Sequence, residues 1–280
     1  MKRFACVVLC LTAVACEPVE PRRARTAVDT TADSAADSGA IATSATSAVT
    51  LPPAAPAKAP ERPELLLPGD HQPGRVNTVS GETWLGLFKS DSTWSLRAVD
   101  VTVVAIANAC TDTAGQKSGR RVGVEGSETP MLLVRGVPGL KPAAVRTVLA
   151  ERQQLYPGQR RDLDLGSRGR WSIAAYGSVP PPPGGRAGQN AIREYSLVAS
   201  RSPGPVGQTL FAFRVGANGV GLDVPPAVLW AGELNGDGQL DVFVDLTTGE
   251  APGPLVLYVS NPADTTQLLR KAAEYQPGGC

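Results

Sequence analysis

Short apolar runs separated by glycine and proline fill the chain from about residue 65 to residue 280. Several runs alternate between apolar and polar positions or are rich in β-branched residues, which is typical of strands. We expect strands at 84–89, 94–107, 131–135, 143–150, 171–176, 195–201, 209–215, 227–233, 241–246 and 255–260. About ten short strands with few helical stretches predict an all-β domain, either a sandwich or barrel-like.

Two segments of this region are harder to interpret. Residues 266–275 contain helix-favouring residues, and both a terminal helix and a last strand remain open there. The tetraproline Pro180–Pro183, followed by two glycines, predicts a long surface loop.

The first sixteen residues predict an export signal. Lys2 and Arg3 precede a twelve-residue apolar run that is too short to span a bilayer. The run ends in Ala13, Val14, Ala15 and Cys16, which resembles the lipobox of bacterial lipoproteins. That resemblance implies cleavage before Cys16 and lipidation of its thiol and amine. With Glu17 after the cysteine, it also implies an outer-membrane lipoprotein that faces the periplasm or the cell surface. An ordinary secretory signal is the alternative.

Residues 17–64 predict a disordered linker, because alanine, serine, threonine and proline leave almost no large apolar side chain to bury. Cys6 and Cys10 leave with the signal, so Cys110 and Cys280 remain as an even pair in an oxidising compartment. A disulfide between them would close a loop of roughly 170 residues and contribute at most about 5 kcal/mol. Two free thiols are the alternative.

Side-chain oxygens recur at alternate positions in the loop 233–241. Calcium takes about six to eight oxygen ligands, and a tight loop can point its first, third and fifth residues at one centre. Gly238 at the sixth position lets the chain turn so that the next carbonyl also faces inward. The candidate ligands are the side chains of Glu233, Asn235, Asp237 and Asp241 and the carbonyl of Gln239.

The strands expected on both sides of this loop argue against an EF-hand, as does Val244 at the position of the EF-hand glutamate. The segment instead resembles the calcium loop of FG-GAP-type repeats, as in integrin β-propellers. The resemblance covers about fifteen residues and implies the same five ligands, with glutamate in place of aspartate at the first position. A metal-free turn remains an alternative, because Asn235-Gly236 and Asp237-Gly238 are also strong hairpin-turn pairs.

The usual catalytic motifs are absent from the sequence. His71 is the one histidine, and neither a nucleophile elbow nor a P-loop is present. The acid pairs Asp162 with Asp164 and Asp241 with Asp245 could serve a glycosidase. We expect the first pair to lie on a solvated, charge-paired strand edge. The four tryptophans, at 84, 94, 171 and 230, are expected to be core anchors and not a sugar-binding platform.

The net charge of +1, without a basic stripe, argues against nucleic-acid binding. The sequence predicts a membrane-anchored envelope lipoprotein whose calcium-stabilised β domain is a non-enzymatic binding or structural module. Its partner, a protein or a glycan, is not identified. The alternative is a calcium-dependent hydrolase acting on glycans or envelope polymers, which would need two acids converging in a cleft.

Overall fold

The computed structural model describes residues 62–179, 192–204, 207–215, 221–264 and 267–279. The chain divides into two units, Met1–Ala55 and Pro56–Cys280, and all of the described residues belong to the second. Strands dominate these ranges, in which the one helical element is a single 3-10 turn, η1 (Gly166–Arg168). No helix among them has the length and apolar character needed to cross a membrane. The predicted all-β fold is confirmed.

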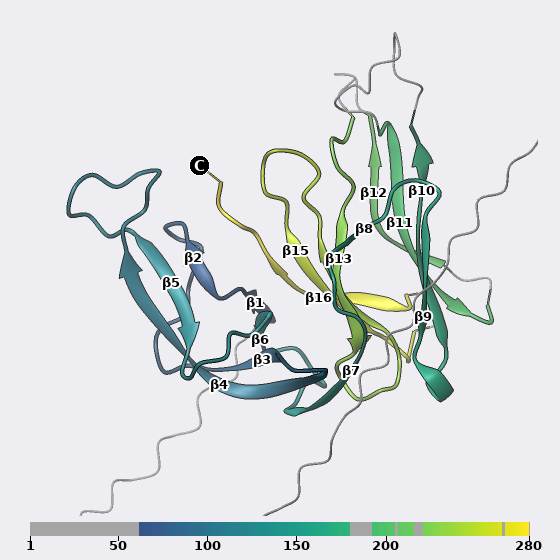
Figure 1. Ribbon diagram of the computed structural model, residues 1–280, viewed down its shortest axis with the longest axis horizontal. Coiled ribbons are helices and arrows are strands. Elements are labelled where there is room, and N and C mark those ends of the chain that lie inside the picture. Colours follow the sequence, from purple (N-terminus) through teal and green to yellow (C-terminus); the bar gives the residue numbers. More distant parts are fainter. Residues whose placement is uncertain (1–61, 180–191, 205–206, 216–220, 265–266, 280) are drawn as a thin grey trace, which may run out of the picture. The chain divides into compact units, whose positions relative to one another are not determined.

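In the described ranges, sixteen antiparallel strands form two sheets (Figure 1). The main path of the larger sheet runs β1 (Glu64–Leu66), β6 (Leu132–Arg135), β3 (Thr83–Ser90), β4 (Thr93–Ile106), β7 (Ala143–Leu149), β13 (Ala227–Glu233), β14 (Asp241–Asp245), β15 (Leu255–Ser260) and β16 (Leu269–Tyr275). Beside this path, β5 (Gly119–Val124) joins β4 to β2 (Gly69–His71), and β8 (Gln153–Gln154) pairs with β13. The smaller sheet has the order β12 (Gly207–Arg214), β11 (Glu194–Ser202), β10 (Arg170–Ser178) and β9 (Arg160–Asp164).

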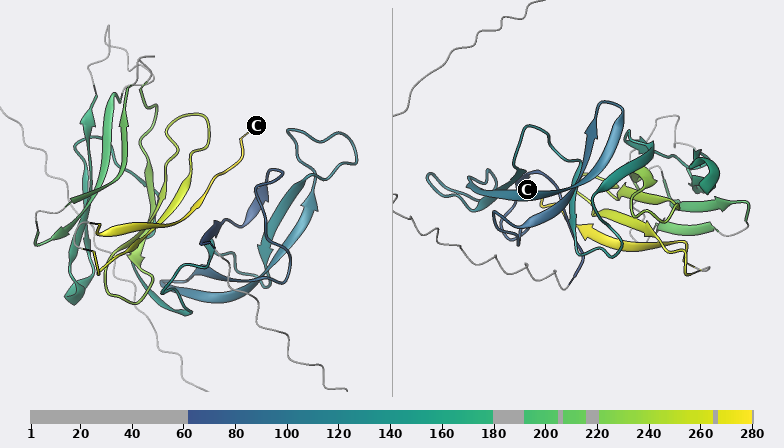
Figure 2. Two further views of the ribbon diagram at one scale, coloured as in Figure 1. Left: turned by 180° about the vertical axis from the view of Figure 1, so that it is seen from behind. Right: turned by 90° about the horizontal axis from the view of Figure 1, so that it is seen from below.

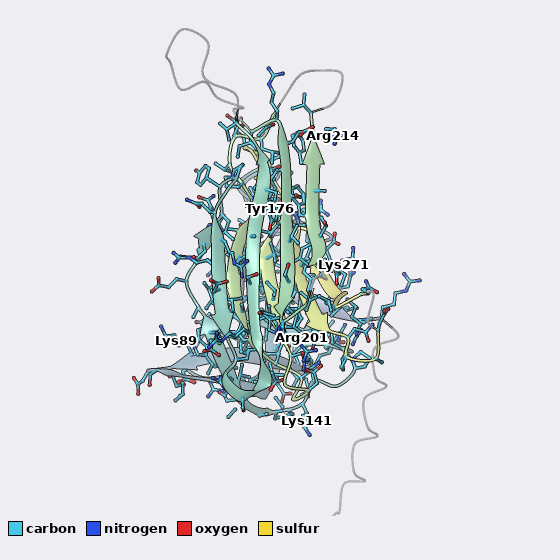
Figure 3. The ribbon with its side chains drawn as sticks, turned by 90° about the vertical axis from the view of Figure 1, so that its right-hand side faces the viewer. Lys89, Lys141, Tyr176, Arg201, Arg214 and Lys271 are labelled. Carbon is cyan, nitrogen blue, oxygen red and sulfur yellow. The ribbon has the colours of Figure 1, made fainter. Side chains whose placement is uncertain are left out.

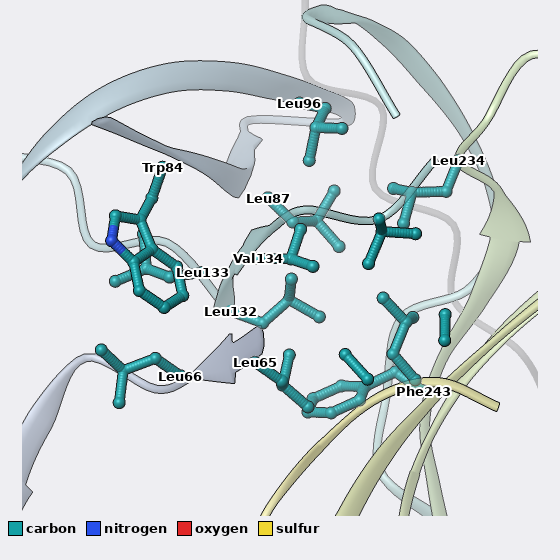
Figure 4. Close-up of a cluster of buried hydrophobic side chains, with 14 of the residues drawn as sticks. Leu65, Leu66, Trp84, Leu87, Leu96, Leu132, Leu133, Val134, Leu234 and Phe243 are labelled. Carbon is teal, nitrogen blue, oxygen red and sulfur yellow. The ribbon is translucent and has the colours of Figure 1, made fainter. Parts of the chain in front are cut away.

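The larger sheet curls around a first apolar core. Its end strands β1 and β16 contact each other, so the sheet is barrel-like and nearly closed. Leu65 and Leu66 of β1 belong to the same buried cluster as Trp84, Leu87 and Phe243 (Figure 4). Apolar side chains from most strands of the main path therefore fill one interior.

A second core lies between the smaller sheet and strands β13–β16, which form a sandwich (Figures 1 and 2). Trp171 and Leu197 come from the smaller sheet, and Val242, Val244 and Val256 come from the larger one. Strand β14 therefore has both faces buried, since Phe243 belongs to the first core and its two valine neighbours to the second. This double burial explains the nearly continuous apolar sequence of β14. Strands β13, β15 and β16 likewise contribute side chains to both cores.

All ten predicted strands are present, and residues 269–275 form a strand and not a helix. The structure has six strands beyond the expected ten. Five of them are β1, β2, β5, β8 and β9, and the sixth is β16, for which the sequence had left both a helix and a strand open. The four tryptophans are buried, between 0 and 7% exposed, so the core-anchor prediction is confirmed. Figure 3 looks onto the smaller sheet, with Tyr176 on β10 and Arg214 on β12.

Several predictions concern residues outside the described ranges. These are the signal with Cys16, the linker as far as residue 61, the tetraproline Pro180–Pro183, and Cys280.

Candidate metal centre

The loop 234–240 joins β13 to β14, which pair with Gly232 opposite Asp241. Gly236 and Gly238 have φ values of +83° and +81°, in the left-handed region that favours glycine. Strands flank the loop on both sides, as predicted, so it is not part of an EF-hand. The hairpin brings the two ends of the proposed ligand set, Glu233 and Asp241, to neighbouring strands.

Side-chain oxygens of the loop turn inward and accept hydrogen bonds from backbone N–H groups of the same loop. The N–H of Asp237 donates to Oδ1 of Asn235 at 3.1 Å, and the N–H of Gln239 donates to Oδ1 of Asp237 at 2.7 Å. The N–H of Gly236 donates to Oε1 of Glu233. These are the bonds of a tight polar turn, and they also bring the predicted ligand oxygens to the inner side of the loop.

Asp241 is the most deeply buried acid of the hairpin, with no solvent exposure. Its Oδ2 accepts the N–H of Leu234 at 2.6 Å, and its Oδ1 accepts the N–H of Ser260 at 2.8 Å. Burial raises the pKa of Asp241 to about 7, against the lowering effect of the bonds from Ser260 and Leu234. The negative charge of Asp237 raises it further. At neutral pH this carboxyl group is therefore poised between its neutral and charged forms.

Ser260, from β15, lies between the two carboxylates. Its Oγ is 2.5 Å from Oδ2 of Asp237 and 3.0 Å from Oδ1 of Asp241. The amide of Asn235 donates to the same Oγ at 3.2 Å. A hydroxyl group has one proton, so it can donate to only one of the two carboxylates at a time. Each oxygen also has a second donor, since Oδ2 of Asp237 accepts the amide of Asn235 at 3.1 Å and Oδ1 of Asp241 accepts the N–H of Ser260. A proton on Asp241 or a cation would offset the like charges of the two carboxylates.

Gln239 adds a further oxygen to the loop. Its Oε1 is buried and has no hydrogen-bond partner in the described part of the chain. A buried acceptor without a donor costs free energy unless another group satisfies it. The sequence had pointed to the carbonyl of this residue and not to its side chain.

The structure brings Asn235, Asp237 and Asp241 together around Ser260, whereas Glu233 holds the loop through Gly236. Within the described ranges, no three His, Cys, Asp or Glu side chains are grouped so that they could hold a metal ion. A divalent cation at this loop would therefore depend on amide, hydroxyl or carbonyl oxygens as well as carboxylates. Such mixed oxygen sets suit calcium. The sequence could not indicate Ser260, because it lies nineteen positions beyond Asp241 on another strand.

The other acid pairs have structural partners. Asp162 pairs with Arg160 at 2.7 Å on the edge strand β9, so the predicted charge-paired edge is confirmed. Asp245 pairs with Arg152 at 2.6 Å. Asp241 and Asp245 lie at opposite ends of β14, ~13 Å apart at the rise of an extended strand. That separation exceeds the roughly 5–10 Å that glycosidases use.

Cys110 lies beside the described end of the chain. It is disulfide-bonded, and its Sγ accepts a bond from Nε2 of Gln72 at 3.2 Å. Gly278 packs against the side chain of Gln72, and Pro277, Gly278 and Cys110 line one pocket. Because Cys280 lies outside the described residues, its pairing with Cys110 stays a prediction.

Comparisons with protein-family models, with curated proteins and with solved structures find no match to this chain.

Proposed function

We propose that the chain is a membrane-anchored envelope lipoprotein whose β domain is a binding or structural module stabilised by calcium. The observation that carries the calcium proposal is the position of Asp241. This carboxyl group is fully buried and shares one hydroxyl group with Asp237. The hydrogen bonds that it accepts come from backbone N–H groups and a hydroxyl group, not from a cationic side chain. A cation at this position would remove the repulsion between the two acids.

The residues that would hold the ion are Glu233, Asn235, Asp237 and Asp241 with the carbonyl of Gln239. When bound, calcium supplies positive charge without chemistry of its own and links β13 to β14. Because that hairpin contributes side chains to both apolar cores, an ion there would stabilise the whole domain. Glu233 stands at the first loop position in place of aspartate, and Val244 at the twelfth position cannot supply a side-chain ligand. Both features favour weak calcium binding, with a Kd on the order of 10⁻⁴–10⁻³ M, as in extracellular modules.

Calorimetric titration of the EDTA-treated full-length chain with calcium tests this proposal. We expect one binding event, which Asp237→Ala removes and which the matched control Asp162→Asn, on β9, leaves in place. Absence of binding at 10 mM calcium, on the order of ten times the weakest Kd expected, would contradict the calcium proposal.

The proposed location in the cell envelope depends on residues 1–16 and is independent of the metal. Acylation of Cys16 would tether the chain to the membrane, and the linker 17–64 would separate the domain from the lipid surface. We expect Cys16→Ser to move the chain from the membrane fraction to the soluble fraction. A chain that stays in the membrane fraction after this substitution would contradict lipid anchoring.

The bond between Cys110 and Cys280 belongs to the same proposal, because an exported domain folds in an oxidising compartment. Its support is the position of Pro277 and Gly278 beside Cys110. Peptide mapping of the non-reduced chain should recover the two cysteines in one cross-linked fragment.

A further inference from the structure

His71 ends strand β2 and is 6% exposed. It is the one histidine of the chain. Beside it lies a pocket of about 420 Å³, which we call the tail pocket. His71, Ile106, Asn108, Tyr275 and Pro277 are among its lining residues. The ring thus lies where the beginning and the end of the domain meet.

The hydrogen bonds of the ring define its tautomer. Nε2 is 2.8 Å from the carbonyl oxygen of Leu67, which can only accept, so Nε2 carries the proton. Nδ1 is 2.5 Å from the hydroxyl group of Tyr275, which donates to it when the imidazole is neutral. The two rings also meet edge to face, with centroids 5.4 Å apart.

This contact lies beside the seam of the barrel-like sheet, because His71 is on β2, which follows β1 along the chain, and Tyr275 is on β16. In the described part of the chain, β1 pairs with β6 and β16 pairs with β15, and no backbone pairing joins β1 to β16. Side chains therefore hold the seam closed. They are the apolar residues Leu65, Leu66 and Tyr275 of the first core, together with the bond between His71 and Tyr275.

The charged groups around the ring compensate a positive charge on it only in part. Asp70 is its nearest acid, and Arg121 binds both oxygens of that carboxylate, at 2.5 and 2.9 Å. Arg120 lies opposite His71 on β5, and Arg75 exerts a positive charge on Tyr275. Burial lowers the pKa of His71, against smaller raising effects of the Leu67 carbonyl and Asp70.

We propose that His71 and Tyr275 form an acid-sensitive latch that joins β2 to β16 beside the seam between β1 and β16. Protonation of Nδ1 removes the acceptor of the Tyr275 hydroxyl proton, so that the hydroxyl oxygen must instead accept a hydrogen bond from the ring. It also places a positive charge in a buried position, which Asp70 offsets only in part. The result is a weaker hold on β16 and on the segment 276–279, so that the tail pocket opens. This latch is separate from the calcium loop and does not depend on its occupation.

The sign of the pH effect follows from linkage. The folded-state pKa of His71 lies below its ordinary value of 6.5. The latch therefore gives its full stabilisation of the closed state above pH 6.5, and this stabilisation decreases as the pH falls toward the folded-state pKa of His71.

Hydrogen exchange of the β16 amides in the full-length chain, at pH 7.5 and 5.0 and corrected for intrinsic rates, tests the latch. We expect opening at 272–275 to increase at the lower pH, because the open state binds the proton more tightly than the closed state does. His71→Gln keeps a neutral side chain at both pH values and should show less than about a twofold change. Asp241 is present in both proteins, so its titration contributes equally to both.

A second measurement needs no variant. Because the chain has one histidine, its imidazole resonance titrates without overlap from another ring. The midpoint should lie below pH 6.5, and the change of exchange in β16 should occur between pH 6.5 and that midpoint. A midpoint at or above 6.5, or equal pH dependence of exchange in the wild type and His71→Gln, would overturn the proposal.

Discussion

The backbone N–H and the hydroxyl group of Ser260 both approach Oδ1 of Asp241, at 2.8 and 3.0 Å. Through this pair the end of β15 holds the beginning of β14 and, through Asp237, the loop before it. The polar contacts of the loop thus extend beyond its own hairpin. A change in the loop should therefore affect the register of three strands.

Replacing Ser260 with alanine should destabilise the calcium-free domain by about 1–3 kcal/mol, because two buried or half-buried carboxylates lose the hydroxyl group between them. Urea unfolding at pH 7 measures the loss. The control is Ser196→Ala on β11, where the side chain alternates with the buried Tyr195 and Leu197 and should change stability by less than about 0.5 kcal/mol. Equal effects of the two substitutions would show that the Ser260 hydroxyl group does not bind the acids.

The buried carboxyl group of Asp241 should make the calcium-free domain less stable as the pH rises from 4 to 7. Its folded-state pKa of about 7 exceeds its ordinary value of 3.8, so the folded state retains a proton that the unfolded chain releases. The loss amounts to at most about 4 kcal/mol across this range. Carboxylates with lowered pKa values, such as Glu128, act with the opposite sign. The measurement is therefore the difference in unfolding free energy between the wild type and Asp241→Asn, from urea unfolding, which isolates the Asp241 contribution and should fall as the pH rises from 4 to 7. A slope that Asp241→Asn leaves unchanged would mean that Asp241 titrates normally.

The side-chain amide of Gln208, on β12, bonds both backbone groups of Leu269, on β16. Its Nε2 donates to the carbonyl oxygen at 2.5 Å, and its Oε1 accepts the N–H at 2.7 Å. Gln208→Glu should cost about 1–3 kcal/mol at pH 7, because a carboxylate can accept the N–H but repels the carbonyl oxygen. Below pH 4 the protonated acid regains a donor. The difference in unfolding free energy between Gln208→Glu and the wild type should therefore be smaller at that pH than at pH 7. A difference in unfolding free energy that does not depend on pH would exclude this explanation.

The sequence was sufficient to predict the strands that have a strong apolar pattern. The strands around both cores were predicted because their apolar residues recur in long or alternating runs. Strands β5 and β9 were not, because each buries few side chains among charged ones, as in the arginine- and aspartate-rich β9 with its single buried Leu163. Strands β1 and β2 have three residues each, too few for a period to appear.

The candidate site was predictable only where its residues are local in sequence. The loop spacing identified Glu233, Asn235, Asp237 and Asp241, but it could not identify Ser260, whose position follows from the pairing of β14 with β15. Nor could the sequence show that Asp241 would be fully buried, since that depends on packing between the sheets. The contact between His71 and Tyr275 joins residues 204 positions apart and was equally out of reach.

The most direct test of a calcium-stabilised domain is thermal unfolding of the full-length chain in EDTA and in 10 mM calcium, beside Asp237→Asn. With a Kd on the order of 10⁻⁴–10⁻³ M, calcium should stabilise the wild type by about 1.4–2.7 kcal/mol and raise its melting temperature by a few degrees. Asp237→Asn should show little or no calcium effect. A wild-type melting temperature that is the same in EDTA and in calcium would contradict the account.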